Sequence, residues 1–151
     1  MIRWARQLPL PPGQVTGTVA ATVLSRILPA RLPGRGSVHR AAGSVLLLIG
    51  GVMIAWALGE RSRRATGPFE LEQPESLVTT GPYRLTRHPM YVGWWLLHLG
   101  FGLVQSSAWV LATLPATILA EHTGVVTEEA DLLERFGGDF QSYATRVPRY
   151  L

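Results

Sequence analysis

Two separate stretches of this sequence carry the side chains best suited to chemistry. The first runs from Ser76 to Gly93 and contains aromatic, basic and titratable residues, namely Tyr83, Arg84, Arg87, His88 and Tyr91. The second is an adjacent pair of carboxylates, Glu128 and Glu129. Aromatic faces attract cations, carboxylates accept hydrogen bonds, and an imidazole changes charge near neutral pH. Brought together, these groups would form a site for a small molecule.

Prolines shape the first stretch into a loop that folds back on itself. Pro82 and Pro89 each push the preceding residue, Gly81 or His88, away from the helical region of backbone space. Pro89 also suits the first turn of a new helix, where its missing N–H would have had no partner. We therefore expect this loop to lie at the mouth of the apolar segment that follows it.

Each of these features also has a simpler explanation. In isolation His88 is more typical of an interfacial histidine that bonds a backbone carbonyl. Glu128 and Glu129 are typical of solvated residues at the start of a helix. A carboxylate at a membrane interface is costly without a partner, however, so the residues alone leave the two explanations about even. No two histidines have metal-ligand spacing on one helical face and there is no cysteine, so we expect no metal site.

Apolar blocks predict helices that cross a membrane. Hydrophobic residues make up 47% of the 151 residues and charged residues 16%. Ala41 to Gly59 is the clearest block, because its 19 uncharged residues would cover about 28 Å, close to the thickness of the bilayer's hydrocarbon core. The predicted spans are 14–30, 41–59, 90–105 and 108–124. Within and between them we expect close helix packing at Gly50-Gly51, a tight turn at Ser106-Ser107 and a kink at Pro115.

Residues 127–151 differ in character from the apolar blocks. Their apolar side chains recur at three- and four-residue steps, which predicts an amphipathic helix. We expect this helix to be interrupted at Gly137-Gly138, to stop at Pro148, to lie at the membrane surface and to cover the central loop. The whole chain, 1–151, is then a single membrane domain.

The basic residues indicate the topology. All 14 are arginines, and they flank the apolar blocks rather than forming one stripe, which favours a membrane over nucleic acid as the partner. With four spans, ten of them fall on the side of both termini and four at the other end, namely Arg26, Arg31, Arg35 and Arg40. The positive-inside rule makes the richer side cytoplasmic. We therefore expect an integral protein of a bacterial-type inner or plasma membrane, with its site facing the cytoplasm.

Taken in order, the motifs resemble a known family. LVTTGPYRLTRHPMYVGWW, followed after an apolar hairpin by TEEADLLERFGGDFQSYATRVPR, resembles the isoprenylcysteine carboxyl methyltransferase family. That family also resembles bacterial phospholipid methyltransferases. The resemblance covers roughly the C-terminal half of the chain, and its specificity comes from the joint match in order.

The resemblance implies an all-α integral membrane methyltransferase that uses S-adenosylmethionine at the cytosolic face. It implies that Ser76, Leu77 and Val78 contact the cofactor through the backbone. Tyr83, His88 and Tyr91 would line it, and Glu128 would bind a polar part of it. Independent chemistry agrees, since a sulfonium suits aromatic faces and the cofactor's carboxylate suits an arginine such as Arg87.

One position departs from the family pattern. The prenylcysteine enzymes have an arginine one turn before the carboxylate that corresponds to Glu128, and here that position is Gly124. We therefore expect a different lipophilic acceptor, entering from the bilayer, with Arg146 among the arginines that could still supply a cation. An amine or hydroxyl acceptor needs a base, for which His88 and Glu129 are the catalytic candidates.

Two other functions remain open at this stage. The chain could be a non-catalytic membrane scaffold or lipid-binding module with the same fold, and Gly124 is the best support for that reading. It could also be a membrane reductase using a nicotinamide cofactor, because some sterol reductases have a related C-terminal architecture.

Overall fold

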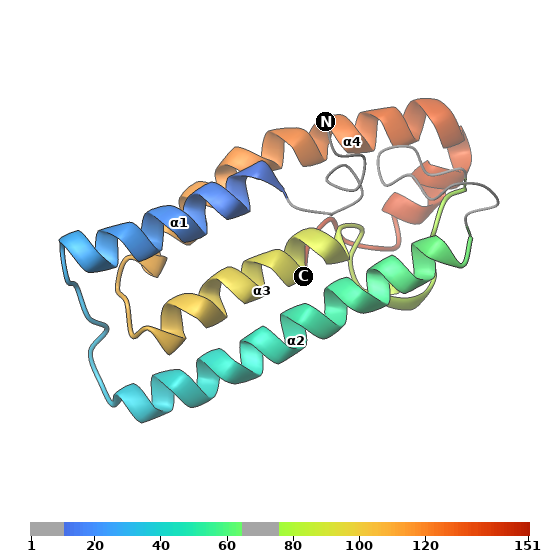
Figure 1. Cartoon of the computed structure of the whole chain (residues 1–151). Coiled ribbons are helices and arrows are strands. Elements are labelled where there is room, and N and C mark those ends of the chain that lie inside the picture. Colours follow the sequence, from blue (N-terminus) through green and yellow to red (C-terminus); the bar gives the residue numbers. More distant parts are fainter. Residues whose placement is uncertain (1–10, 65–75) are drawn as a thin grey trace, which may run out of the picture.

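The computed structural model describes residues 11–64 and 76–151, and within these ranges the fold is entirely helical. The elements are α1 (Pro12–Ile27), α2 (Gly36–Ser62), the short 3-10 helix η2 (Gly81–Arg84), α3 (Pro89–Val104) and α4 (Val110–Ala144). Successive α-helices run in alternating directions, and α3 lies between α2 and the pair formed by α1 and α4 (Figure 1). The expected all-α class is confirmed.

Helix boundaries follow the proline and glycine signals closely. Prolines occupy the first turns of α1 and α3, as their missing N–H groups favour. These two helices therefore begin and end within three residues of the predicted spans 14–30 and 90–105. α2 is longer than the predicted 41–59, because it begins at Gly36 and continues through the charged residues to Ser62.

The expected separation of a span at 108–124 from a cap at 127–151 is not observed. α4 (Val110–Ala144) continues past residues 124–127 and bends only at Gly137, because a buried stripe at four-residue spacing continues across the expected boundary. That stripe consists of Glu121, Val125 and Glu129. Pro115 also lies inside α4 without breaking it, and the helix changes direction at Gly137 instead, where φ is 51°. The predicted interruption at Gly137 is thus confirmed.

Glycines bring α2 and α3 into backbone contact. A side chain at Gly43 would place its Cβ 2.6 Å from the carbonyl oxygen of Gly100, and one at Gly50 would stand 2.6 Å from that of Gly93. The expectation of close packing therefore holds for Gly50. Gly51 faces away, with no atom within 4 Å of a Cβ built there.

The two connections at one end of the bundle are joined by backbone hydrogen bonds. The N–H of Leu32 donates to the carbonyl of Ser106 (2.9 Å), and the N–H of Ala108 donates to that of Ala30 (2.8 Å). Ser106 adopts a left-handed conformation (φ 52°) in the predicted tight turn. These bonds tie the α1–α2 connection to the α3–α4 connection, which leaves the central loop and the end of α4 together at the opposite end (Figure 1).

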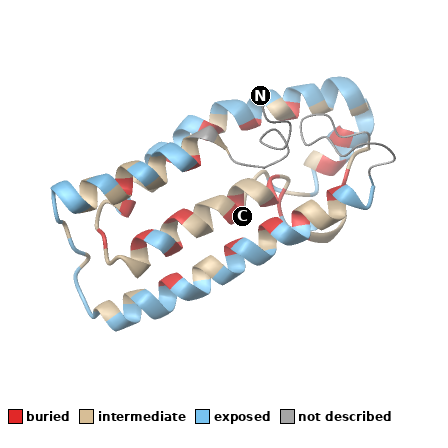
Figure 2. Ribbon diagram, viewed as in Figure 1, coloured by how far each residue is buried: buried red, intermediate tan, exposed pale blue. Residues whose placement is uncertain are grey.

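The outward faces of the helices are exposed (Figure 2), and many of the residues on them are large and apolar. On α2 they expose Val45, Leu48, Val52 and Trp56, and on α4 Leu111 and Leu119. Such continuous apolar surface is rare on a soluble monomer and typical of contact with lipid. By length and composition α2 and α4 could each cross a membrane, while α3 is a shorter apolar helix.

Candidate functional site

The segment after the Gly137 bend closes over the central loop, as the sequence predicts. The hydroxyl of Tyr143 donates to the carbonyl of Tyr83 (2.7 Å), and the hydroxyl of Thr86 donates to that of Arg149 (2.8 Å). The backbone N–H of Arg87 donates to the carbonyl of Pro148 (2.9 Å). These bonds hold residues 83–88 beneath the C-terminal segment.

Glu129 lies at the centre of the contacts between the central loop and the C-terminal segment. Its carboxylate accepts hydrogen bonds from Nε of Arg87 (2.8 Å), Nη2 of Arg149 (2.8 Å) and Nε2 of His88 (3.0 Å). The remaining guanidinium nitrogen of Arg87 donates to two backbone carbonyls near the end of α4. Because Glu129 is 8% exposed, these are charge-assisted bonds in a largely dry setting.

His88 is held in its neutral form. Burial lowers its pKa below the ordinary 6.5, and this outweighs the opposing effects of Glu128 and Glu129. The charge of Glu129 is already shared by two guanidinium groups, so a third cation there would be poorly compensated. With Nε2 donating to Glu129, Nδ1 keeps its lone pair, and it lies 3.8 Å from Oε2 of Glu128. Two acceptor atoms thus face each other.

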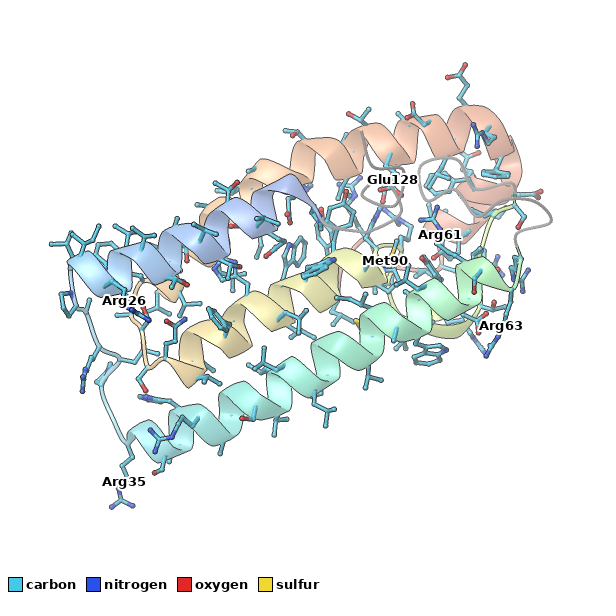
Figure 3. All side chains as sticks on the ribbon, in the orientation of Figure 1. Arg26, Arg35, Arg61, Arg63, Met90 and Glu128 are labelled. Carbon is cyan, nitrogen blue, oxygen red and sulfur yellow. The ribbon has the colours of Figure 1, made fainter. Side chains whose placement is uncertain are left out.

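A half-open pocket lies beside this network. Its empty volume, including the mouth, is about 420 Å³. It is lined by Arg61, Ser76, Leu77, Val78, Tyr83, Arg87, Glu128, Leu132, Phe140 and Tyr143. Figure 3 shows Arg61 from α2 and Glu128 from α4 on the two sides of the same space. Six of the eight expected cofactor residues therefore meet at one pocket.

Tyr83 and Arg61 are two of the polar residues in the pocket wall. The hydroxyl of Tyr83 is buried and has no hydrogen-bond partner among the described residues. Burial raises the pKa of Tyr83 to about 12, although the nearby positive charge of Arg61 opposes the rise. A ligand that bonds this hydroxyl beside the guanidinium of Arg61 would be stabilised here.

The other two expected cofactor residues, His88 and Tyr91, lie beside the pocket as part of an aromatic group. The ring of His88 is 5.8 Å from that of Tyr91 and 6.2 Å from that of Tyr150. Tyr150 in turn contacts the indole of Trp95 at 4.8 Å. These rings extend the site from the pocket toward the interior of the helix bundle.

The two expected substrate residues lie outside the pocket lining. Gly124 is exposed, with no atom within 4 Å of a Cβ built there. Arg146 is exposed and donates to the backbone carbonyl of Ser142 in the last turn of α4. In the described residues no group of three or more histidine, cysteine or acidic side chains is placed to hold a metal ion.

Several lining residues were missed by sequence reasoning. Arg61 reads as one charge of a stop signal after an apolar helix, and Leu132, Phe140 and Tyr143 read as the apolar face of an amphipathic helix. Their role depends on which elements meet, and the only hint was that the apolar face of 127–151 needed something to cover. Tyr150, which belongs to the aromatic group beside the pocket, was not predicted by any sequence pattern.

Comparisons with known proteins agree with these motifs. The nickel-cobalt-cadmium resistance protein NccN of Alcaligenes xylosoxydans xylosoxydans is 36% identical over 74 residues, which is 49% of this chain and 35% of that protein. The protein-S-isoprenylcysteine O-methyltransferase of Schizosaccharomyces pombe is 35% identical over 74 residues, or 48% of this chain and 31% of the enzyme. Protein-S-isoprenylcysteine O-methyltransferase B of Arabidopsis thaliana is 29% identical over 111 residues, or 70% of this chain and 55% of the enzyme.

A broader comparison identifies the family. In each of these three relatives the match covers well under two thirds of the relative's own length. The sequence model of the phospholipid methyltransferases, by contrast, matches residues 38–139, from the start of α2 through the bend in α4, and so includes the pocket-lining residues up to Leu132. The resemblance to the isoprenylcysteine carboxyl methyltransferases is thereby confirmed at the level of the family, and the chain belongs to the phospholipid methyltransferase family.

Proposed function

We propose that this protein transfers a methyl group from S-adenosylmethionine to a lipophilic acceptor that enters from the membrane. The observation that carries the proposal is the pocket, which combines aromatic walls, a buried cation and a carboxylate in a protein of a methyltransferase family. When bound, the cofactor supplies an electrophilic methyl group on a sulfonium.

The pocket residues fit the parts of that cofactor by chemistry. Aromatic faces at Tyr83, Phe140 and Tyr143 suit the adenine ring and the sulfonium. The guanidinium of Arg61 suits its carboxylate. The facing acceptors, Nδ1 of His88 and Oε2 of Glu128, would both be satisfied by an amino or ribose hydroxyl donor placed between them.

His88 and Glu129, the two catalytic candidates, are assigned different roles. Each oxygen of Glu129 already accepts hydrogen bonds from cationic or imidazole donors, so we assign it the task of positioning His88 and Arg87. For an amine or hydroxyl acceptor we assign Nδ1 of His88 to accept its proton, and Glu128 alone then bonds the cofactor's donor. A carboxylate or thiolate acceptor would need no base, and His88 would then act only in binding.

The site is proposed to face the cytoplasm of a bacterial inner membrane, with all four α-helices crossing the bilayer. α1 and α3 have 16 residues each, or about 24 Å at the helical rise, so they would need some local thinning or help from flanking residues. Figure 3 supports this orientation, because Arg61 and Arg63 lie at the pocket end and Arg26 and Arg35 at the other.

The test is calorimetry on the purified protein in detergent with three ligands. We expect binding of S-adenosylmethionine and of its demethylated product, and no binding of NADPH. Methyl transfer is then measured by incubating the protein with a membrane lipid extract and radiolabelled methyl donor, followed by chromatography. Binding of NADPH alone would favour the reductase, and binding of none of the three, in protein that melts cooperatively, would favour a scaffold.

A further inference from the structure

A second buried polar cluster lies between α1, α3 and α4, apart from the pocket. Gln14, His98 and Glu121 are 2%, 2% and 6% exposed, in helices whose outer faces are apolar. Nε2 of Gln14 donates to Oε2 of Glu121 (3.1 Å), and the indole N–H of Trp95 donates to the same oxygen (2.8 Å). Nδ1 of His98 lies 3.2 Å from Oε1 of Gln14. Polar groups at such depth are expensive, and a binding role is the usual reason for their presence.

Glu121 is the incomplete member of this cluster. Both of its donors bond Oε2, whereas Oε1 is buried and has no hydrogen-bond partner in residues 11–64 and 76–151. The contrast with Glu129 is clear, since both oxygens of that carboxylate accept bonds from guanidinium groups. A buried carboxylate oxygen without a donor carries an unfavourable desolvation cost that a bound donor would remove.

The backbone of α1 comes close to Oε1 with no side chain in between. α1 passes the carboxylate at Gly13, and a Cβ built on that glycine would stand 3.1 Å from Oε1 of Glu121. One turn further, a Cβ at Gly17 would collide with the side chain of Thr117. Two small residues on one face of α1 therefore allow the helix to approach the cluster while keeping a side chain out of the space next to Oε1.

This cluster is connected to the proposed reaction site. Glu121 and Glu129 lie eight residues apart on the same buried face of α4, or about 12 Å along the helix. Tyr150 lies between them, because its ring contacts both Trp95 (4.8 Å) and His88 (6.2 Å). The cluster therefore lies further from the pocket end of the bundle than His88 does.

We propose that Oε1 of Glu121 binds the polar head of the acceptor, and that this head presents an N–H or O–H donor. The methylation of that acceptor rests on the proposed function, whereas its binding at Glu121 does not. An amine or an alcohol would satisfy Oε1, whereas a carboxylate head has no proton to donate to it. Glu121 thus favours amine- or alcohol-headed lipids over carboxylate-headed lipids as acceptors.

The test compares three probes that share one chain and differ in the head group, namely hexadecylamine, hexadecanol and hexadecanoate. Their affinities are measured by thermophoresis at a fixed micelle concentration, without cofactor, and the affinity for S-adenosylmethionine is measured separately. In the wild type we expect the amine or the alcohol to bind at least about tenfold more tightly than the acid. Glu121→Gln should reduce this ratio about tenfold and leave cofactor affinity unchanged.

Two further variants keep the test decisive. Glu134→Gln removes an exposed carboxylate from the same helix and should leave the head-group preference intact. Gly13→Ala places a methyl group beside Oε1 and should weaken binding of the amine and alcohol even if Glu121→Gln fails to fold. A wild type that prefers hexadecanoate, or an unchanged ratio in both Glu121→Gln and Gly13→Ala, overturns the inference. Loss of cofactor binding in the wild type would instead overturn the proposed function and leave the head-group preference standing.

Discussion

Burial of His88 makes the stability of the fold depend on pH. The folded-state pKa is lower than the ordinary 6.5, so below that pH the unfolded chain binds more protons than the folded protein. The contribution of His88 to stability is therefore complete above about pH 6.5 and declines as the pH falls toward the lowered pKa. Thermal unfolding in detergent between pH 8 and 5 should show this decline in the wild type and less of it in His88→Asn. Identical pH profiles for the two proteins would contradict the assignment.

The carboxylate of Glu128 and the imidazole of His88 are expected to bind the cofactor from opposite sides. His88→Ala and Glu128→Ala should each weaken binding of S-adenosylmethionine by about 1–3 kcal/mol, the cost of leaving a polar partner unmatched. Calorimetry measures the change, and circular dichroism checks that each variant remains folded. Glu134→Ala, an exposed position on the same helix, is the matched control. Wild-type affinity in both site variants would mean that the cofactor binds elsewhere.

Between elements, the contact of α2 with α3 depends on glycine. Gly50→Ala would place a methyl group 2.6 Å from the carbonyl oxygen of Gly93, so the helices would have to separate. We expect a loss of about 1–3 kcal/mol in unfolding free energy, as for other overpacked contacts. Gly51→Ala, one position along, meets open space and should be neutral or slightly stabilising because alanine favours helix. Denaturant titration in mixed micelles compares the two, and equal effects would contradict the packing argument.

At the level of helices, the sequence predicts a boundary or a bend correctly where a single residue determines it. Pro89 defines the start of α3 and Gly137 the bend in α4 because each acts on its own backbone. The sequence did not predict that α4 continues past residue 124. That continuity depends on other elements packing against the face of α4 that carries Glu121 and Glu129. The same holds for the site: a motif places His88 and Glu128 together, whereas Arg61 joins them only through the packing of α2 on α3.

For the molecule as a whole, the arrangement of charge predicts which end faces which compartment. Arg26 and Arg35 lie at one end and Arg61 and Arg63 at the other, the end that also holds the pocket (Figure 3). If all four helices span, reporter fusions after Arg64 and after Leu151 should both read cytoplasmic, and one after Gly36 should read external. A cytoplasmic signal from the Gly36 fusion would remove α1 from the set of spans.

The glycine contacts between α2 and α3 also determine where the C-terminal end of α2 lies relative to the pocket. Gly43 faces Gly100 and Gly50 faces Gly93, so each seven-residue step along α2 is matched by a seven-residue step back along α3. Eleven residues beyond Gly50, α2 reaches Arg61, whose side chain lines the pocket together with Tyr83 of η2. One residue inserted between Gly50 and Arg61 would rotate the end of α2 by about 100° and advance it by about 1.5 Å. That insertion would withdraw the arginine from the pocket without altering any residue that lines it.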